Sequence, residues 1–120
     1  MDYRCIYFLV NVLFASYKII HMHKFDFENQ SAIITGGAQG FGLDIAKRFL
    51  ESGCNVFIWD IDEKLLIKTI DEINNPNLNY HVVDVSKYAE VEKFVGEITN
   101  KNKIDILINN AGITGPTDPL

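Results

Sequence analysis

The stretch that decides the fold reads SAIITGGAQGFG and occupies residues 31–42. Its first half is a short apolar run rich in β-branched residues, which predicts a buried strand over Ser31–Thr35. Its second half is a glycine cluster that opens a helical pattern over residues 40–52, and Gly53 follows as a stop signal. The expected apolar stripe of that helix consists of Phe41, Ile45 and Phe49, widened by Leu43, Ala46 and Leu50.

The same alternation of strand and helix continues to the end of the chain. Strands are predicted over residues 55–59, 80–83 and 104–108, a helix over 62–73 with Asp62 as its N-cap, and a helix that Ser86 caps. The inward residues expected are Leu65, Leu66, Thr69, Ile70 and Ile73 on the former helix, and Tyr88, Val91, Val95 and Ile98 on the latter; Glu90, Glu92, Lys93 and Glu97 are expected to form a solvated face. Strands joined by helical crossovers run parallel. The pattern therefore predicts a Rossmann-type, doubly wound α/β sheet that stops after its fourth strand.

The glycine cluster suits a phosphate group because it lies where a strand meets a helix. A helix start offers free N–H groups and about half a positive charge, which favours a bound pyrophosphate. Gly36 permits a sharp turn, Gly40 lets the backbone approach phosphates, and Gly42 allows close packing of helix on strand. The competing interpretation is a glycine-rich turn without a ligand. A P-loop is excluded because no Gly-Lys-Ser/Thr follows.

Asp60 favours the nucleotide interpretation. It lies at the tip of the second strand, where its carboxylate can accept hydrogen bonds from the 2′- and 3′-hydroxyls of an adenosine ribose. It would repel a 2′-phosphate, since two unit charges ~4 Å apart at a dielectric near 20 interact by about 4 kcal/mol. Neither Ile61 nor Gln39 supplies a compensating cation. The sequence therefore predicts NAD(H) rather than NADP(H).

Composition narrows the class of protein further. A hydrophobic content of 48% in 120 residues fits one folded domain, and a net charge of −5 argues against a nucleic-acid partner. Cys5 and Cys54 have no metal-ligand or disulfide pattern, which indicates a reducing, cytoplasmic setting, with Cys54 as a buried apolar residue. His21 and His23 lack a third ligand nearby, so no metal site is predicted.

The first 24 residues form a separate apolar extension. Residues 5–20 are strongly apolar, yet a helix of that length spans roughly 24 Å, short of a ~30 Å hydrocarbon core. A signal peptide, a membrane anchor and a translation start at Met22 are the three interpretations; we favour the start at Met22. The nucleotide-binding region is then expected over residues 25–120.

Four motifs make residues 25–120 resemble the short-chain dehydrogenase/reductase family, the 3-oxoacyl-carrier-protein reductases in particular. Thr35 to Gly42 is similar to that family's glycine loop, and Asp60 matches its ribose-binding acid. Asp84-Val85 resembles the pair that binds adenine, and Asn109-Asn110-Ala111-Gly112 resembles the motif after strand four. There the resemblance implies that Asn110 lies beside the cofactor ribose and that Asn109 ties strands together. The cofactor-binding residues expected are Gly36, Gly37, Gln39, Gly40, Phe41, Gly42, Asp60, Ile61, Asp84, Val85, Asn110, Ala111 and Gly112.

The resemblance also implies a reaction, namely hydride transfer between nicotinamide and a carbonyl or secondary alcohol. The family performs it with a serine and a Tyr-x-x-x-Lys motif, and neither Tyr80 nor Tyr88 has a lysine four residues later. We therefore expect no catalytic residue here and interpret the chain as a truncated reading frame carrying the cofactor half of an enzyme that forms a dimer or tetramer when whole. The alternative is a non-catalytic sensor of dinucleotides. The sequence does not name the substrate.

Overall fold

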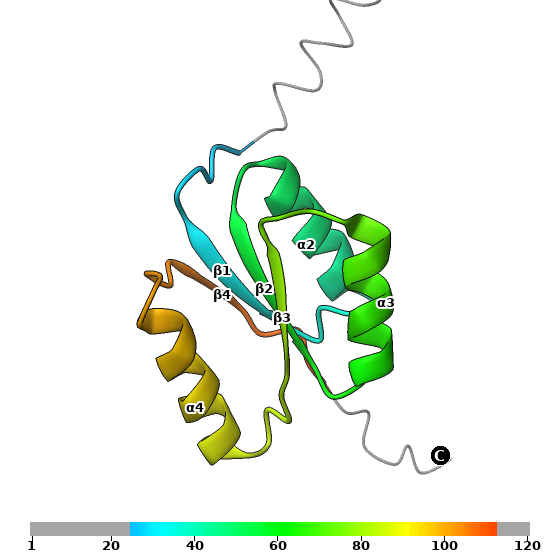
Figure 1. Ribbon diagram of the computed structural model, residues 1–120, viewed down its shortest axis with the longest axis vertical. Coiled ribbons are helices and arrows are strands. Elements are labelled where there is room, and N and C mark those ends of the chain that lie inside the picture. The colour runs from blue at the N-terminus through cyan, green and yellow to red at the C-terminus, as the bar shows by residue number, and fades with distance from the viewer. Residues whose placement is uncertain (1–24, 113–120) are drawn as a thin grey trace, which may run out of the picture.

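The structure is a computed structural model that describes residues 25–112 (Figure 1). Its elements are β1 (Ser31–Thr35), α2 (Gly40–Glu51), β2 (Asn55–Asp60), α3 (Glu63–Ile73), β3 (Leu78–Val82), α4 (Tyr88–Thr99) and β4 (Ile106–Ile108). The predictions about residues 1–24, including the start at Met22 and the anchor over 5–20, lie outside the described residues. Within residues 25–112, the structure contains no helix of the length and apolarity needed to cross a membrane.

The four strands form one parallel sheet in the order β3-β2-β1-β4. Strand order runs outward from β1 to β3 and then returns past β1 to β4. The side on which successive strands are added therefore switches between β1 and β4. In doubly wound sheets, ligands bind beyond the carboxyl ends of the strands at such a switch. This confirms the predicted Rossmann-type α/β fold and directs attention to the loops after β1, β2 and β4.

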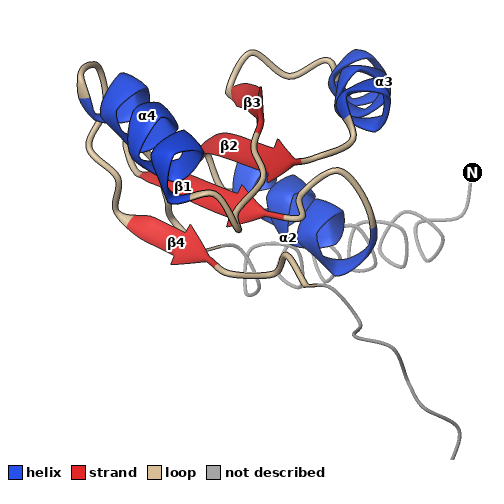
Figure 2. Ribbon diagram, turned by 90° about the horizontal axis from the view of Figure 1, so that it is seen from below, coloured by secondary structure: helices blue, strands red, loops and turns tan. Residues whose placement is uncertain are grey.

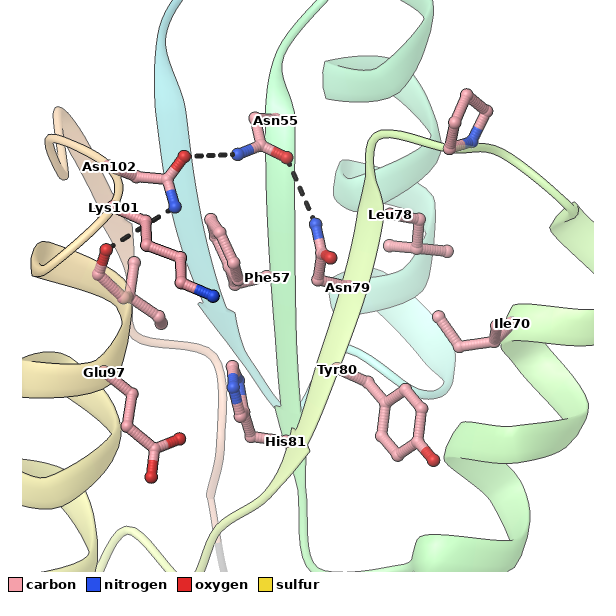
Figure 3. Close-up of a pocket in the computed structure, with 12 residues that line it drawn as sticks. Asn55, Phe57, Ile70, Leu78, Asn79, Tyr80, His81, Glu97, Lys101 and Asn102 are labelled. Atoms are coloured by element: carbon pink, nitrogen blue, oxygen red, sulfur yellow. Dashed lines mark hydrogen bonds between the residues drawn. The ribbon is translucent and has the colours of Figure 1, made fainter.

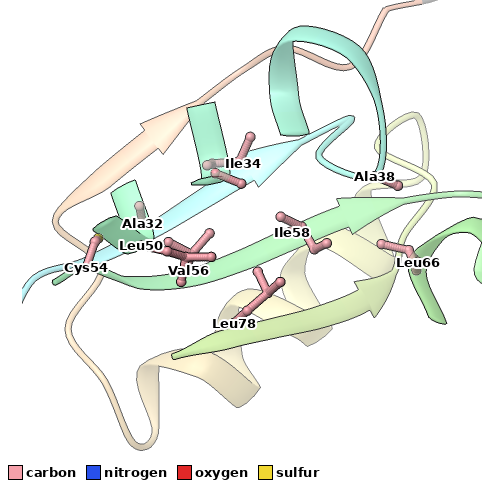
Figure 4. Close-up of a cluster of buried hydrophobic side chains, with 10 residues drawn as sticks. Ala32, Ile34, Ala38, Leu50, Cys54, Val56, Ile58, Leu66 and Leu78 are labelled. Atoms are coloured by element: carbon pink, nitrogen blue, oxygen red, sulfur yellow. The ribbon is translucent and has the colours of Figure 1, made fainter. Parts of the chain in front are cut away.

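Helices cover both faces of the sheet, with α2 and α3 on one face and α4 on the other (Figure 2). Alternate strand residues point to opposite faces, so Ile34 and Ile58 pack under α2 and α3 while Ile33 and Phe57 pack under α4. The α2/α3 face holds the larger buried cluster, which Figure 4 shows: Ala32, Ile34, Ala38, Ala46, Leu50, Cys54, Val56, Ile58, Leu66 and Leu78. The fully buried Cys54 in this cluster confirms its predicted role as a small apolar residue.

Two predicted strand boundaries were wrong by two residues. The third strand begins at Leu78, two residues early, because Asn79 satisfies its polar side chain by donating to Asn55 Oδ1 at 3.1 Å. The fourth strand begins only at Ile106. The Asp105 carboxylate accepts a hydrogen bond from Ser31 N at 3.0 Å and thereby replaces part of the ladder between the two strands.

Three side chains on the helices also differ from the prediction. Phe41 is 82% exposed, because the row of α2 in closest contact with the sheet is that of Gly42 and Ala46. Tyr88 is 77% exposed, at the first turn of α4. Ser86 does not cap that helix, since its hydroxyl donates to Asp84 Oδ1 at 2.6 Å and Lys87 occupies the N-cap position. By contrast, Asp62 caps α3 as predicted, with its carboxylate accepting from Leu65 N.

Candidate functional site

The loop between β1 and α2 is packed so tightly that a side chain would overlap its neighbours at two positions and crowd them at a third. A Cβ at Gly42 would overlap the carbonyl oxygen of Gly36, and one at Gly37 would lie 2.6 Å from Ile58 Cγ2. Gly36 has a φ of 64°, and an added Cβ would lie 3.0 Å from Asn110 Nδ2. The loop is therefore held rigidly against β2 and the segment after β4.

Gly40, in contrast, is not constrained by packing. A Cβ there would meet no described atom within 4 Å, although the φ of 58° favours glycine. It is the first residue of α2, and the N-cap residue Gln39 makes no side-chain hydrogen bond to the helix start. The first amides of a helix have no intrahelical acceptor. The front of α2 thus offers unsatisfied donors beside an open approach, as expected of an anion-binding helix start.

Asp60 lies beside this loop at the carboxyl end of β2. Its Oδ1 accepts from Ile61 N at 2.8 Å and from Asp62 N at 3.3 Å, while Oδ2 accepts from Ala38 N at the long distance of 3.4 Å. An ionised carboxylate has about four acceptor positions. The main chain therefore fixes the orientation of this side chain and leaves capacity, chiefly on Oδ2, for further donors.

Asp84 follows β3 and is fixed in a similar way. Its Oδ1 accepts from both the amide and the hydroxyl of Ser86, at 3.0 and 2.6 Å. These hydrogen bonds, with help from Lys87 3.8 Å from Oδ2, lower the pKa of Asp84 below its ordinary value of 3.8. At neutral pH the group is an anion that can only accept. Its own amide donates to Glu90 Oε2 at 2.9 Å, which ties the loop to α4.

The segment after β4 closes onto β1 through a threonine. Thr35 Oγ1 accepts from Asn110 N and Ala111 N, both at 3.0 Å, and donates to Ile108 O at 3.4 Å. The Asn110 side chain donates to Gly36 O at 3.2 Å. The tie between strand ends that was expected of Asn109 is thus made, among the described residues, by Asn110. Exposed Gly112 ends this segment.

Three exposed apolar side chains border the same edge of the sheet. Phe41 is 82% exposed, Ile61 71% and Val85 44%. Ile61 directly follows the fixed Asp60, and Val85 directly follows the fixed Asp84. Apolar surface next to oriented acceptors is typical of a ligand site, because a flat heterocycle can cover the first and hydrogen-bond to the second.

Three residues that organise the site were not identified from the sequence. Thr69 is buried on α3 and donates to Ala38 O at 3.1 Å, which fastens the glycine loop to that helix. Its signal was a polar residue within an apolar stripe. Glu90 was assigned to a solvated face, yet it accepts from Asp84 N, and its signal was an acidic residue in the first turn of a helix. Thr35 was noted only as the start of a motif.

The remaining chemistry-bearing residues lie elsewhere. Trp59 is 2% exposed and packs in the core. His81 stacks against Phe57 and Phe94, with ring centroids 6.2 and 4.8 Å away. Within residues 25–112, no three His, Cys, Asp or Glu side chains come together as metal ligands would. His21 and His23 lie outside the described residues.

Comparison with known proteins identifies the class to which this fold and loop arrangement belong. Residues 30–119 match the family model described as short chain dehydrogenase. The chain belongs to the short-chain dehydrogenase family.

Individual relatives agree with that assignment. The 3-oxoacyl-[acyl-carrier-protein] reductase of Chlamydia trachomatis is 42% identical over 93 residues, which cover 72% of this chain and 36% of that protein. A 3-ketoacyl-(acyl-carrier-protein) reductase from Brucella melitensis, solved in complex with NADH, is 39% identical with a TM-score of 0.67, covering 72% of this chain and 36% of that one. A 2-keto-3-deoxy-D-gluconate dehydrogenase from Streptococcus agalactiae is 33% identical with a TM-score of 0.71, and the match covers 79% of this chain and 37% of that one. The chain therefore spans little more than a third of the length of these relatives.

Proposed function

We propose that the carboxyl edge of this sheet binds NAD(H), and that residues 25–120 are the cofactor-binding part of an oxidoreductase acting on an alcohol or ketone. The observation that carries the proposal is the carboxylate of Asp60, fixed by three main-chain amides beside the open start of α2. The diphosphate would lie on the amides around Gly40, and the adenosine ribose on Asp60. The structure of the Brucella melitensis relative with NADH supports a nicotinamide dinucleotide.

The remaining site residues receive roles in the same arrangement. Ile61 and Val85 would enclose the adenine ring between them, and Asp84 would accept from its exocyclic amine. Asn110, Ala111 and Gly112 would border the second ribose near the carboxyl end of β4. Gly36, Gly37, Gln39, Phe41 and Gly42 complete the proposed loop around the diphosphate.

The choice of NAD over NADP rests on charge. A 2′-phosphate would bring two negative charges against the Asp60 carboxylate, and no lysine or arginine stands next to it in the sequence. Even discounted severalfold for solvent, a repulsion of about 4 kcal/mol leaves a preference for NADH of tenfold or more. Hydride transfer itself would use nicotinamide as the carrier. We place the protein in the cytoplasm on its cysteine usage, with Cys54 as a free buried thiol.

Titration of the chain with NADH, followed by isothermal calorimetry, tests the proposal. Asp60→Asn removes a charged acceptor of the ribose hydroxyls and is expected to weaken binding about tenfold to a hundredfold. Asp71→Asn, an exposed site on α3, removes the same charge away from the site and is the matched control. Equal affinities for the two variants, or no binding by the parent chain, would refute the proposed site.

A further inference from the structure

We propose that β3 is a dimerisation edge, at which a second copy of this chain adds its own β3 antiparallel across a two-fold axis through Tyr80. Among the described strands, the sheet ends at β3 on that side, since β3 pairs only with β2 in the order β3-β2-β1-β4. The strand reads LNYHV and contains no charged residue and no proline, the residues with which natural sheets protect an edge. In Figure 2, β3 lies at the end of the sheet with α3 on one side and α4 on the other.

The main-chain groups of β3 face outward in a self-complementary pattern. Val56 N donates to Asn77 O and Val83 N donates to Asp60 O, so the odd-numbered residues of this stretch hydrogen-bond toward β2. In a parallel ladder the alternate residues, Leu78, Tyr80 and Val82, then turn their N–H and C=O outward. The amide of Leu78 is already used, because it donates to Asn75 O at 3.0 Å.

A two-fold axis through Tyr80 pairs these outward groups with one another. Each Tyr80 exchanges both of its hydrogen bonds with the Tyr80 of the other copy. Each Val82 N–H then donates to the Leu78 carbonyl of the other copy. Leu78 donates nothing in return, because its amide is already used within its own chain. A two-fold axis through His81 would also pair these free donors, by setting Tyr80 opposite Val82 of the other copy, so the side chains choose between the two centres.

Side chains repeat this self-complementarity on the α3 face. The pairing sets Tyr80 against Tyr80 and Leu78 against Val82, and cross-strand aromatic and aliphatic pairs of this kind stabilise antiparallel strands. Tyr80 and Val82 are 36% and 38% exposed in the single chain, and Ile67 on the neighbouring α3 is 44% exposed. The apolar surface that a second copy would cover is therefore present.

Charges on the α4 face have the order that a two-fold axis requires. A hollow of about 620 Å³ runs along β3 and is bordered on one side by Glu97 and Lys101 of α4 and the turn after it. In Figure 3, Glu97 lies at the His81 end of this hollow and Lys101 extends into it from the Asn79 and Asn102 end. Antiparallel pairing places Asn79 opposite His81 of the other copy, so Lys101 of each copy is brought toward Glu97 of the other. Within the described part of the chain, Lys101 forms no ion pair.

Sedimentation velocity of the full chain over a range of concentrations tests the proposal. The parent chain is expected to form a dimer, and Tyr80→Lys is expected to weaken it about a hundredfold or more, because two ammonium groups meet at the axis. Tyr88→Lys, at an exposed tyrosine of α4, makes the same change away from β3 and should leave the dimer intact. Leu107→Lys tests the other edge of the described sheet, that of β4.

A charge exchange distinguishes a direct contact from a loss of folding. Glu97→Lys and Lys101→Glu should each weaken self-association about tenfold, since each places like charges together. Mixed in equal amounts, the two variants should dimerise with each other, because every pair across the axis is then opposite in sign. A monomeric parent chain, a dimer that survives Tyr80→Lys or is lost only with Leu107→Lys, or a mixture that associates no better than its components would overturn the proposal.

Discussion

The two faces of the sheet differ in how firmly their helices are held. Under α2 and α3, Ile34, Ile58 and Leu66 are completely buried in a continuous cluster. Under α4 the cluster is smaller, and among the described residues of that helix only Ile98 is buried. A ring nitrogen of His81 is also buried there without a hydrogen-bond partner, a costly arrangement that is absent from the other cluster of described side chains.

This difference divides the proposed nucleotide site into a rigid and a looser part. The glycine loop and Asp60 belong to the α2/α3 face, where Thr69 and Ala38 link the loop to α3. Asp84 and Val85 belong to the loop that leads into α4, and they depend on Glu90 and Lys87 of that region. The diphosphate and ribose would therefore meet preformed groups, whereas the adenine side would rest on the less stable helix.

The largest expected effect compares buried residues on the two faces. Leu66→Ala should lower the free energy of unfolding by about 3 kcal/mol, because the cavity opens in a rigid core. Ile98→Ala should cost about half as much, since α4 can settle into the space. Urea denaturation of both variants measures the two values. Equal losses would mean that the faces are equally rigid.

Replacing a glycine by alanine on each side of the sheet compares the two faces again, with smaller expected effects. Gly42→Ala should destabilise the chain by about 2 kcal/mol, because the methyl group overlaps the Gly36 carbonyl. Gly96→Ala on α4 meets nothing within 4 Å and should stabilise the helix by about 0.8 kcal/mol. Thermal unfolding of each variant gives the sign directly, and a stabilising Gly42→Ala would contradict the close approach of α2 to the loop.

The smallest effect is a dependence of stability on pH. Burial lowers the pKa of His81 below its ordinary value of 6.5, against an opposing influence of Glu97 and with a further lowering by Lys93. Below pH 6.5 the unfolded chain then binds more protons than the folded one, so the free energy of unfolding falls as the pH drops toward the folded-state pKa. Parallel urea titrations with His81→Phe, which keeps the stacking but cannot titrate, should lack this loss. Identical pH profiles would show that His81 stays protonated or solvated in the fold.

At lower pH a second loss is expected from the carboxylates. The pKa of Asp105 is lowered chiefly by the hydrogen bond from Ser31 N, and that of Asp84 by the hydrogen bonds from Ser86. Their contribution is present above the ordinary value of 3.8 and is lost as the pH falls through their lowered values. In the same denaturation series, Asp105→Asn should lose less free energy of unfolding than the parent chain as the pH falls through this range.

Much of the fold followed from local patterns in the sequence. The strand Ser31–Thr35 and the cap of α3 by Asp62 were predicted to the residue, because an apolar run bounded by glycines and an Asp before a helical stripe are strong local signals. The parallel order followed from the crossovers. The boundaries of β3 and β4 could not be read in this way, since Asn79 and Asp105 take part in pairings with residues far away in the sequence.

The candidate site was likewise predictable only where neighbouring residues in the sequence determine it. Glycine spacing and Asp60 identified the loop and its acidic neighbour, and the structure brings them together through Ala38 N. The roles of Thr35 and Thr69 depend on which strand end or helix lies opposite them, and no spacing within the sequence encodes this. Phe41 shows the same limit, because helical periodicity does not reveal which row of α2, here that of Gly42 and Ala46, packs on the sheet.

The ratio of NADH to NADPH affinity tests the central claim most directly. Calorimetric titration of the parent chain should give at least about a tenfold preference for NADH, because Asp60 accepts from the free 2′-hydroxyl and repels a phosphate there. Asp60→Asn should bring the two dissociation constants close together, while Asp71→Asn should leave the ratio unchanged. A preference for NADPH in the parent chain, or a ratio that does not respond to Asp60→Asn, would contradict the account.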